Sequence, residues 1–290
     1  MHKTYLICRR ITILLVAIAI PASLFGTLPQ LYGAHLKQSK PFADSQLINK
    51  PPTDDAAIKA SANQRKRKRK TLTWTELHKM YPGVFFYGGS RNSKKVALTF
   101  DDVPDLKYTP QVLDILSKHR VPATFFVMGT RAARYPSVVS RIRQEGHMVG
   151  NHSYNHPSFP RISKRQFQQQ ISRTDEILRP LIGYSPRFIR PPYGEITAEQ
   201  VEWAKKNGYI IVNWDVDSED WKGIGSNRVL RNIQRTLQPG SIILQHAGGS
   251  EDLSGTIKAL PKLIEMLQDN GYEIVPLPEL LNRSVDRKVR

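Results

Sequence analysis

The sequence predicts an α/β fold built on a parallel sheet, and three observations lead to this prediction. From Thr71 onward, short apolar runs alternate with longer amphipathic runs, an order typical of parallel strands joined by helices. Seven such units fit either a (β/α) barrel or an open doubly wound sheet. The GxGxxG fingerprint of a dinucleotide-binding sheet is absent, because the pairs Gly88-Gly89 and Gly248-Gly249 do not fit it.

The predicted strands are short runs of apolar residues, many of them β-branched or aromatic, as in KVALTF, ATFFVM and IIVNWD. Each run is bounded by polar, glycine or proline residues, which are typical of turns. In chain order the predicted strands are Lys95–Phe100, Ala123–Met128, Met148–Asn151, Phe188–Arg190, Ile210–Asp215, Ser241–Gln245 and Glu273–Val275.

The predicted helices alternate with these strands and carry apolar residues at helical spacing. Ser163 is a candidate N-cap and Pro180 a stop for the third helix, while Gly208 and Gly271 close two later helices. In chain order the predicted helices are Thr109–His119, Pro136–Glu145, Ser163–Arg179, Thr197–Asn207, Asn227–Leu237 and Ser254–Asn270, and a short segment, Pro278–Asn282, follows the last strand.

Length and composition divide the chain into three parts. The 290 residues are 40% hydrophobic, which suffices for one large domain with additions. The formal net charge is +18, and residues 1–70 hold more than half of this excess, with 13 Lys+Arg against 3 Asp+Glu. We expect an export segment at 1–34, a polybasic linker at 35–70 and a folded domain at 71–290. The single cysteine, Cys8, excludes a disulfide framework and a cysteine-rich zinc site.

The first part has the pattern of an export signal. Lys3, Arg9 and Arg10 precede an uncharged stretch at 11–34, which matches a positive region followed by an apolar one. One outcome is an uncleaved membrane anchor, since the stretch is near the roughly 20 residues that a membrane helix needs. The other is a cleaved signal peptide, with Gly33-Ala34 as a weak cleavage site. Both predict an extracytoplasmic protein, either membrane-anchored or secreted into the cell wall.

The second part is polar and ends in six consecutive basic residues, Arg65–Lys70. Such a run is typically solvated and disordered. Outside a cell it could attract anionic wall polymers or lipid headgroups by charge. Binding to nucleic acid is disfavoured, because it contradicts the export signal. We therefore expect membrane contact through the N-terminal segment and no nucleic-acid partner.

Polar residues cluster directly after the predicted strands, where a barrel carries its chemistry. Asp101 and Asp102 end the first strand, and His152 and His156 follow the third. Two imidazoles and one carboxylate leave an open position, as a catalytic zinc requires. Neighbours in an extended segment point apart, so one aspartate can bind metal while the other faces the reacting water. The alternative is a pair of ordinary loop histidines, because HxxxH spacing alone carries little geometry.

Five motifs occur in order at the predicted strand ends. They are Thr99-Phe100-Asp101-Asp102, the pair His152 and His156, Arg190-Pro191-Pro192-Tyr193, Asp217-Ser218-Glu219-Asp220-Trp221 and Leu244-Gln245-His246. Together they resemble the motifs of the polysaccharide deacetylases, the NodB-homology group or carbohydrate esterase family 4, over residues 87–281. This resemblance implies a distorted (β/α) barrel of seven parallel strands. It also implies removal of N- or O-acetyl groups from a polysaccharide with a divalent metal, zinc in the first place and cobalt as the alternative.

The resemblance further implies a role for each motif residue. Asp101 corresponds to the general base and His246 to the general acid. Asp102, His152 and His156 correspond to the metal ligands.

The other motif residues support or line the site. Arg190 corresponds to the residue that pairs with the base and orients it. Asp220, or as second choice Asp217, corresponds to the carboxylate that supports the catalytic histidine. Trp221 and Leu244 resemble walls of the acetyl pocket, and Tyr193 resembles the residue whose backbone N–H helps to hold the oxyanion.

Two positions bear on the substrate. Many family members have glycine after the aspartate pair, where this chain has Val103, so we expect a different loop shape but the same ligands. A subgroup acting on muramic-acid-type sugars has asparagine in place of the metal-binding aspartate, and Asp102 is intact here. We therefore expect a metal-dependent deacetylase of peptidoglycan N-acetylglucosamine.

Other functions stay open. The polymer could be chitin oligomers, an exopolysaccharide or acetylxylan, because fold and motif separate substrates poorly. An inactive glycan-binding module on the same fold should have lost a ligand or a catalytic residue, and none is missing. A serine hydrolase is disfavoured, since the sequence has no GxSxG motif.

Overall fold

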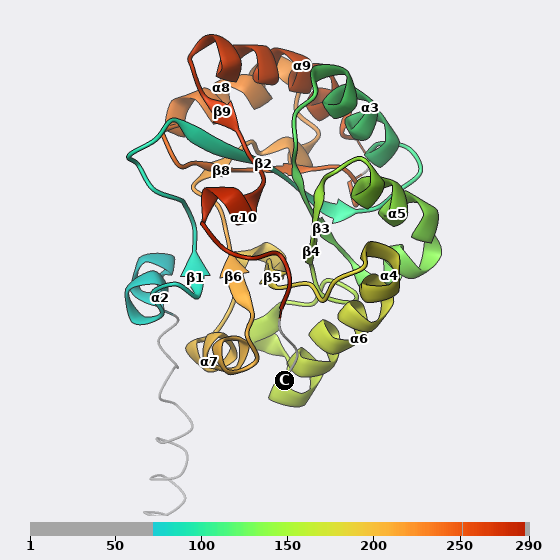
Figure 1. The fold of residues 1–290 in the computed structure, drawn as a ribbon, viewed down its shortest axis with the longest axis vertical. Coiled ribbons are helices and arrows are strands. Elements are labelled where there is room, and N and C mark those ends of the chain that lie inside the picture. Colours follow the sequence, from blue (N-terminus) through green and yellow to red (C-terminus); the bar gives the residue numbers. More distant parts are fainter. Residues whose placement is uncertain (1–71, 251, 288–290) are drawn as a thin grey trace, which may run out of the picture. The chain divides into compact units, whose positions relative to one another are not determined.

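The computed structural model describes residues 72–250 and 252–287. They confirm the predicted fold class: a curled, all-parallel sheet covered by helices forms a distorted, open (β/α) barrel (Figure 1). The predicted export segment at 1–34 and linker at 35–70 lie outside the described residues. Within the described residues, no helix has the length and apolar character needed to cross a membrane.

Strands β2 to β6 lie side by side in chain order, whereas β8 and β7 continue the sheet beyond β2 and the short β1 lies beyond β6. Because parallel strands have their carboxyl ends at one edge, the loops that follow them converge on one side of the barrel. From edge to edge the order is β1 (Phe85–Phe86), β6 (Ile210–Val212), β5 (Phe188–Ile189), β4 (Met148–Asn151), β3 (Thr124–Val127), β2 (Lys95–Val103), β8 (Ile242–His246) and β7 (Val216–Asp217), and β9 (Glu273–Ile274) pairs with β2.

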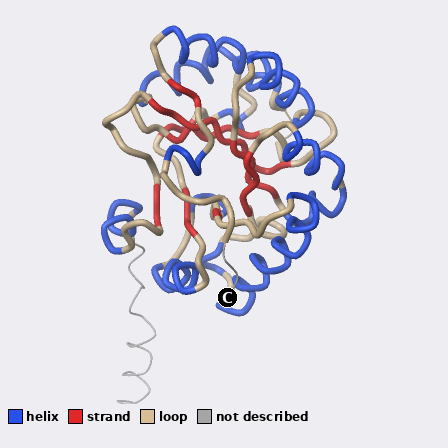
Figure 2. The backbone as a smooth tube through the Cα atoms, viewed as in Figure 1, coloured by secondary structure: helices blue, strands red, loops and turns tan. Residues whose placement is uncertain are grey.

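Most helices lie outside the sheet, as Figure 2 shows in blue around the red strands, but a short helix at Leu277–Leu280 packs on the core inside the barrel. Capping boxes start α6 and α7: the hydroxyls of Ser163 and Thr197 accept from the backbone N–H groups of Gln166 and Gln200, which satisfies donors that a helix start leaves free. The helices are α2 (Trp74–Met80), α3 (Thr109–His119), α4 (Gly129–Arg134), α5 (Pro136–Gln144), α6 (Lys164–Ile182), α7 (Ala198–Lys206), α8 (Ser226–Thr236), α9 (Ser254–Asp269) and α10 (Leu277–Leu280).

The seven predicted strands are all present, but several boundaries differ, and two of these differences have a clear physical reason. Pro180 does not end α6, which continues to Ile182 and closes at Gly183 with φ 79°; in the last turn a proline removes only one helical hydrogen bond. The predicted strand Ile210–Asp215 ends early, at Val212 of β6, and the next strand, β7, begins at Val216 and lies at the far edge of the sheet. Strand pairing of β6 ends here because the buried side chain of Arg190 donates hydrogen bonds to the backbone carbonyls of Val212 and Asn213.

Alternation along β2 separates two cores. Val96, Leu98 and Phe100 belong to the core beneath the outer helices, whereas Ala97 belongs to a second core inside the barrel. Since side chains alternate along a strand, Asp101 continues the inner series. The sheet therefore delivers this carboxylate to the barrel interior at its carboxyl edge.

A buried polar cluster joins α6, β4 and the last described residues. The carboxylate of Asp175 accepts from Asn151 Nδ2 at 2.7 Å, from the Tyr209 hydroxyl at 2.7 Å and from Arg287 Nη2 at 2.9 Å. Asn151 Oδ1 in turn accepts the backbone N–H of Ser153 at 2.9 Å. Burial raises the pKa of Asp175, against the effect of these donors. The cluster fixes the start of the loop that follows β4.

Candidate active site

A cavity of about 450 Å³ opens at the carboxyl edge of the sheet. Its walls come from the carboxyl ends of β2, β7 and β8 and from the loops after β4, β5, β6, β7 and β8, as expected for a barrel of this kind. The lining residues are Asp101, Asp102, His152, His156, Tyr193, Trp214, Asp217, Trp221, Leu244, His246 and Ser250. Nine of them were predicted from the motifs; Arg190 and Asp220, also predicted, are buried and contact lining residues from outside the cavity.

Three side chains in this cavity form a candidate metal site. One donor atom from each of Asp102, His152 and His156 lies within 4.8 Å of the others. Oδ1 of Asp102 is buried and accepts no hydrogen bond, and it faces Nε2 of His152 at 3.4 Å and Nε2 of His156 at 3.3 Å. A buried carboxylate oxygen without a donor, opposite two imidazole nitrogens, fits a divalent cation with two nitrogen ligands and one oxygen ligand.

The surroundings set the charge and tautomer of these ligands. Nδ1 of His152 lies 2.8 Å from the carbonyl oxygen of Arg190; a carbonyl only accepts, so Nδ1 carries a proton and Nε2 faces the cavity. Burial alone lowers the pKa of His152, but Asp101 and Asp102 raise it, so a cation that binds Nε2 displaces a proton from this ring. Burial alone raises the pKa of Asp102, but His152, His156 and His246 hold it well below its usual range. Asp102 is therefore an anion at neutral pH.

Arg190 positions Asp101. Its side chain is fully buried, and Nη1 donates to Asp101 Oδ1 at 2.9 Å and to Thr99 Oγ1 at 2.7 Å. The guanidinium also lies over the ring of Phe126, 4.2 Å from its centroid. Oδ2 of Asp101 lies 3.7 Å from Nε2 of His152. One arginine therefore orients Asp101 through its side chain and a metal-ligand candidate through its carbonyl.

His246 is paired with a buried carboxylate. Its Nδ1 lies 2.8 Å from Asp220 Oδ1, and its backbone N–H donates to Asp220 Oδ2 at 2.8 Å. Thr256 also donates to Asp220 Oδ2. Burial alone lowers the pKa of His246, but Asp220, with Asp101 and Asp102, raises it to about 9. The imidazolium is thus the stable form at neutral pH, as a general acid requires.

The two aspartates proposed to support the histidine have different positions. Asp220 contacts His246, whereas Asp217 accepts the backbone N–H of Glu219 at 2.8 Å and lines the cavity. Burial raises the pKa of Asp217. Between the two choices, the geometry therefore favours Asp220 as the partner of His246.

The remaining predicted residues form the cavity wall. Tyr193 and Trp221 are 62% and 49% exposed, and Leu244 is buried at 3%. Two lining residues were missed: Trp214, which follows β6, and Ser250, which follows β8. Polar and aromatic residues of the site follow the ends of strands. Because the predicted strand Ile210–Asp215 contains Trp214, this residue does not stand out; a strand that ends at Val212 places Trp214 directly after it.

Left-handed backbone conformations concentrate around the cavity. They matter because each costs a non-glycine residue about 1–3 kcal/mol, so packing must enforce it. Within residues 72–250 and 252–287, seven non-glycine residues have positive φ, and five of them lie in the loops around the cavity: Asp102, Ser153, His156, Tyr193 and Glu219.

Two glycines enforce the conformation of Asp102. A Cβ at Gly249 would lie 2.6 Å from Cβ of Asp102, and a Cβ at Gly248 would collide with the Asp102 backbone oxygen. Gly249 itself has φ 81°. In the sequence this pair stands out only because it does not fit a dinucleotide-binding motif. Its function is close approach of the loop after β8 to the aspartate.

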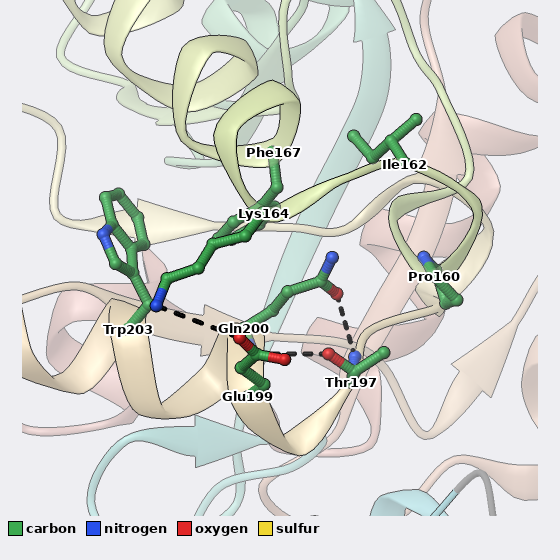
Figure 3. A pocket seen from close by; sticks show the side chains of 8 residues that line it. All are labelled: Pro160, Ile162, Lys164, Phe167, Thr197, Glu199, Gln200 and Trp203. Carbon is green, nitrogen blue, oxygen red and sulfur yellow. Dashed lines mark hydrogen bonds and ion pairs between the residues drawn. The ribbon is translucent and has the colours of Figure 1, made fainter. Parts of the chain in front are cut away.

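A second hollow, between α6 and α7, has a different character (Figure 3). It measures about 50 Å³. Lys164 and Glu199 form an ion pair of 3.9 Å at its edge, and Phe167 and Trp203 form its apolar wall. The only group of candidate metal ligands found among the described residues is in the larger cavity.

The chain is similar to curated proteins of one kind. A family model for polysaccharide deacetylases matches residues 88–212. A peptidoglycan-N-acetylglucosamine deacetylase of Bacillus cereus is 43% identical over 216 residues, covering 74% of this chain and 78% of that protein. A chitooligosaccharide deacetylase of Bradyrhizobium sp. is 38% identical over 205 residues, covering 67% of this chain and 94% of that protein.

Solved structures are similar in the same region. The Bc1960 peptidoglycan N-acetylglucosamine deacetylase matches with a TM-score of 0.68 and 44% identity, over 69% of this chain and 94% of that chain. BA3943 of Bacillus anthracis, described as a CE4 family pseudoenzyme, matches with a TM-score of 0.64 and 32% identity, over 70% of this chain and 69% of that chain. Since relatives include a pseudoenzyme, similarity alone does not decide activity, and the individual side chains carry the argument.

Proposed function

Because the chain belongs to the polysaccharide deacetylase family, we propose that it hydrolyses the N-acetyl groups of N-acetylglucosamine in peptidoglycan. One observation carries the proposal: a single cavity contains the cluster of Asp102, His152 and His156 together with Asp101 and His246. The similarity to a peptidoglycan-N-acetylglucosamine deacetylase, 43% identical over 74% of this chain, supports this substrate.

The metal-ligand candidates and Asp101 serve the first half of the reaction. Asp102, His152 and His156 would hold a divalent cation, which would polarise the acetyl carbonyl and lower the pKa of a water molecule. Asp101, oriented by Arg190, takes a proton from the attacking water as general base. The ion pair with Arg190 leaves Oδ2 of Asp101 on the side of the metal-ligand candidates, 3.7 Å from His152 Nε2.

His246 and Tyr193 serve the second half. With Nδ1 bound to Asp220, His246 has Nε2 for the substrate and donates a proton to the leaving amine nitrogen. The N–H of Gly194 is committed to the carbonyl of Pro191 at 3.0 Å, so the N–H of Tyr193 is our candidate donor to the developing oxyanion. Trp221 and Leu244 enclose the acetyl methyl group with apolar surface.

The test of this function is the product formed on the wall polymer. Purified full-length chain should release acetate from peptidoglycan, and mass spectrometry of the muropeptides should show glucosamine in place of N-acetylglucosamine. Deacetylation confined to the muramic acid residues would overturn the substrate assignment. If the protein released no acetate from any wall or glycan substrate, the catalytic proposal would be overturned.

A chitin oligomer is the second candidate substrate. The similarity to a chitooligosaccharide deacetylase, at 38% identity over 94% of that protein, favours it. Its acetylated sugar is the same N-acetylglucosamine, so the cavity would use the same groups. Comparing kcat/KM on N-acetylglucosamine oligomers and on peptidoglycan fragments of equal length distinguishes the two candidates.

The metal and the location complete the proposal. We propose zinc as the resident ion, since two imidazoles and one carboxylate with an open position are typical of catalytic zinc, and cobalt as a functional substitute. We also propose that the protein acts outside the cytoplasm, which the charged and apolar pattern of residues 1–34 supports. Elemental analysis and cell fractionation test these two points.

A further inference from the structure

The net positive charge of the folded domain is concentrated in one continuous segment. Residues 129–187 contain ten Lys+Arg against three Asp+Glu, whereas the other described residues (72–128, 188–250 and 252–287) contain 18 of each. Charge that serves solubility alone is usually interspersed over the whole surface. This segment therefore differs in kind from the rest of the domain.

The segment folds into one side of the outer layer. α4 packs on both α5 and α6, and α5 packs on α6; the three helices lie side by side in Figure 1. Arg131 and Arg134 belong to α4, Arg143 to α5, and Arg173 and Arg179 to α6. We call these five residues the arginine face.

Contacts between the helices place these arginines near one another. The guanidinium of Arg173 lies 3.7 Å from the ring centroid of Tyr154, and the carbonyl of Tyr154 accepts the N–H of Thr130 in the first turn of α4 at 2.9 Å. Nε of Arg143 donates to the carbonyl of Ile182, the last residue of α6, at 3.2 Å. The face therefore continues from α4 across α6 to the end of α5.

Carboxylates are sparse on the arginine face, where the exposed Glu176 on α6 lies three residues from both Arg173 and Arg179. Within the described part of the chain, none of its five members forms an ion pair. Arg141 on the same side is paired with Asp114 and Glu145, each at 2.6 Å, and Lys164 is paired with Glu199 (Figure 3). Arg131 is half-buried and the other four are exposed. Unpaired like charges on one face raise the local potential for anions.

The type of basic residue points to oxyanion ligands. The segment contains nine arginines and one lysine, whereas the other described residues contain eight arginines and ten lysines. Arginine grips phosphate and carboxylate oxygens through two parallel N–H donors, while lysine acts as a point charge. A bias toward arginine is thus expected of a binding surface and not of a merely solvated one.

The arginine face adjoins the loop of the metal-ligand candidates. The N–H of Gly129, at the start of α4, donates to the carbonyl of Ser153 at 3.0 Å. Tyr154, beneath Arg173, lies between His152 and His156 in the sequence. We propose that the arginine face binds a phosphodiester polymer of the cell wall and so holds the enzyme beside its acetylated glycan. This rests on the proposed function only in taking the wall as the site of action.

The test compares two sets of charge-removing substitutions in the full-length chain. One variant carries R131Q, R134Q, R173Q and R179Q; Arg143 is kept because it bonds to α6. The matched control carries K205Q, K206Q, K258Q and K262Q, which removes the same charge from exposed positions of α7 and α9. Both retain Arg65–Lys70. The probe is poly(glycerol phosphate), with dissociation constants measured at low and at high salt.

We expect the arginine variant to bind the polymer about tenfold more weakly at low salt, because charge-assisted bidentate contacts are lost, and the control to stay within about twofold. The difference should shrink at high salt. Equal weakening in both variants would overturn the proposal, because net charge would explain the binding. So would a loss of binding to phosphatidylglycerol vesicles without a loss of binding to the polymer, since the partner would then be a lipid surface.

Turnover of a soluble N-acetylglucosamine oligomer should be the same in both variants and the parent chain. None of the substituted residues lines the cavity, so a selective loss of turnover in the arginine variant would contradict a pure docking role. Because poly(glycerol phosphate) carries no acetamido group, its binding does not depend on which glycan is deacetylated. Failure of this inference and failure of the proposed function are therefore separate results.

Discussion

At the scale of single residues, the backbone of Asp102 is what allows two neighbouring carboxylates to serve one cavity. Alternation along β2 directs Asp101 inward and would direct Asp102 away from it. The φ of 59° at Asp102 breaks the alternation, and the close approach of Gly248-Gly249 holds that conformation. Different roles for the two aspartates follow from their adjacent positions in the sequence, but the backbone turn that brings both to the site depends on a loop nearly 150 residues away.

Substitution of Asp101 and of Asp102 should have different effects on turnover and on metal binding. Asp101→Asn should lower turnover on the order of 10²–10⁴-fold, the range for loss of a general base, while metal content stays near one ion per chain. Asp102→Ala should lower metal affinity, and its activity should partly return at high metal concentration. Elemental analysis beside turnover checks both. If Asp101→Asn loses the metal and Asp102→Ala retains it, the roles are reversed.

The pairing of Asp220 with His246 should be visible in the pH profile. The pKa of His246 is raised to about 9, and the protonated ring is the working form, so activity should fall as pH rises through that pKa. Asp220→Asn removes the main attraction for the proton, and the alkaline limb should move to lower pH. The profile of kcat against pH checks this. An unmoved limb in Asp220→Asn would assign the limb to another group.

At the scale of elements, α2 lies outside the region matched by the family model but contacts the catalytic turn. Trp74 Nε1 donates to the carbonyl of Gly194 at 3.0 Å, and Asn213 donates to the same oxygen at 3.0 Å. The ring of Trp74 meets that of Trp214, a cavity residue, with centroids 5.0 Å apart. Tyr193 and Gly194 both have positive φ, so this turn needs such support.

Trp74→Phe should therefore impair catalysis more than binding. It removes the indole donor, and we expect kcat to fall about tenfold, a fraction of the 10²–10³-fold typical of losing an oxyanion donor, with KM and metal content little changed. Tyr81→Phe is the matched control, because it removes a hydroxyl that donates from the end of α2 to Ala198 at 3.1 Å. Equal losses of kcat in both would indicate a general effect of loosening α2.

The sequence predicts best those helices and strands that are long enough to show a periodic pattern of apolar residues. The helix at Thr109–His119 and the strand at Met148–Asn151 have the predicted bounds. The two-residue strands β1 and β7 are too short to show any period. Val103 belongs to the strand rather than to a loop, because it is fully buried at the end of β2. The glycine that many relatives have at this position is not needed here, since the residue with positive φ is Asp102.

At the scale of the whole molecule, the site could be predicted because a parallel barrel brings all carboxyl ends to one edge. Every predicted site residue lies in the cavity or contacts a residue that does. What could not be predicted is set by contacts between distant segments: the indole of Trp74 against Gly194 and the glycines against Asp102. These depend on loop geometry that local pattern does not encode.

Metal removal should lower the stability of the whole domain. The ligand candidates come from β2 and from the loop after β4, which are separated by β3 in the sheet, so a bound ion stabilises only the folded arrangement. At a free metal concentration 100 times Kd the gain is about 2.7 kcal/mol, and chelation should lower Tm by about 5–10 °C. Calorimetry with and without chelator checks this. Asp102→Ala should lose the response, and an unchanged Tm in demonstrably metal-free parent protein would contradict the assignment.

The cluster around Asp175 has a consequence for recombinant design. Arg287 bonds to Asp175, Asp175 to Asn151, and Asn151 to the N–H of Ser153, so the last described residues brace the segment that carries two histidines. A protease cut or a truncation before Arg287 would remove the guanidinium that pairs with the buried carboxylate of Asp175, more than 100 residues away along the chain. A trimmed preparation could thus stay soluble and monodisperse while its histidine loop is released, and its quality should be judged by bound metal rather than by its elution volume.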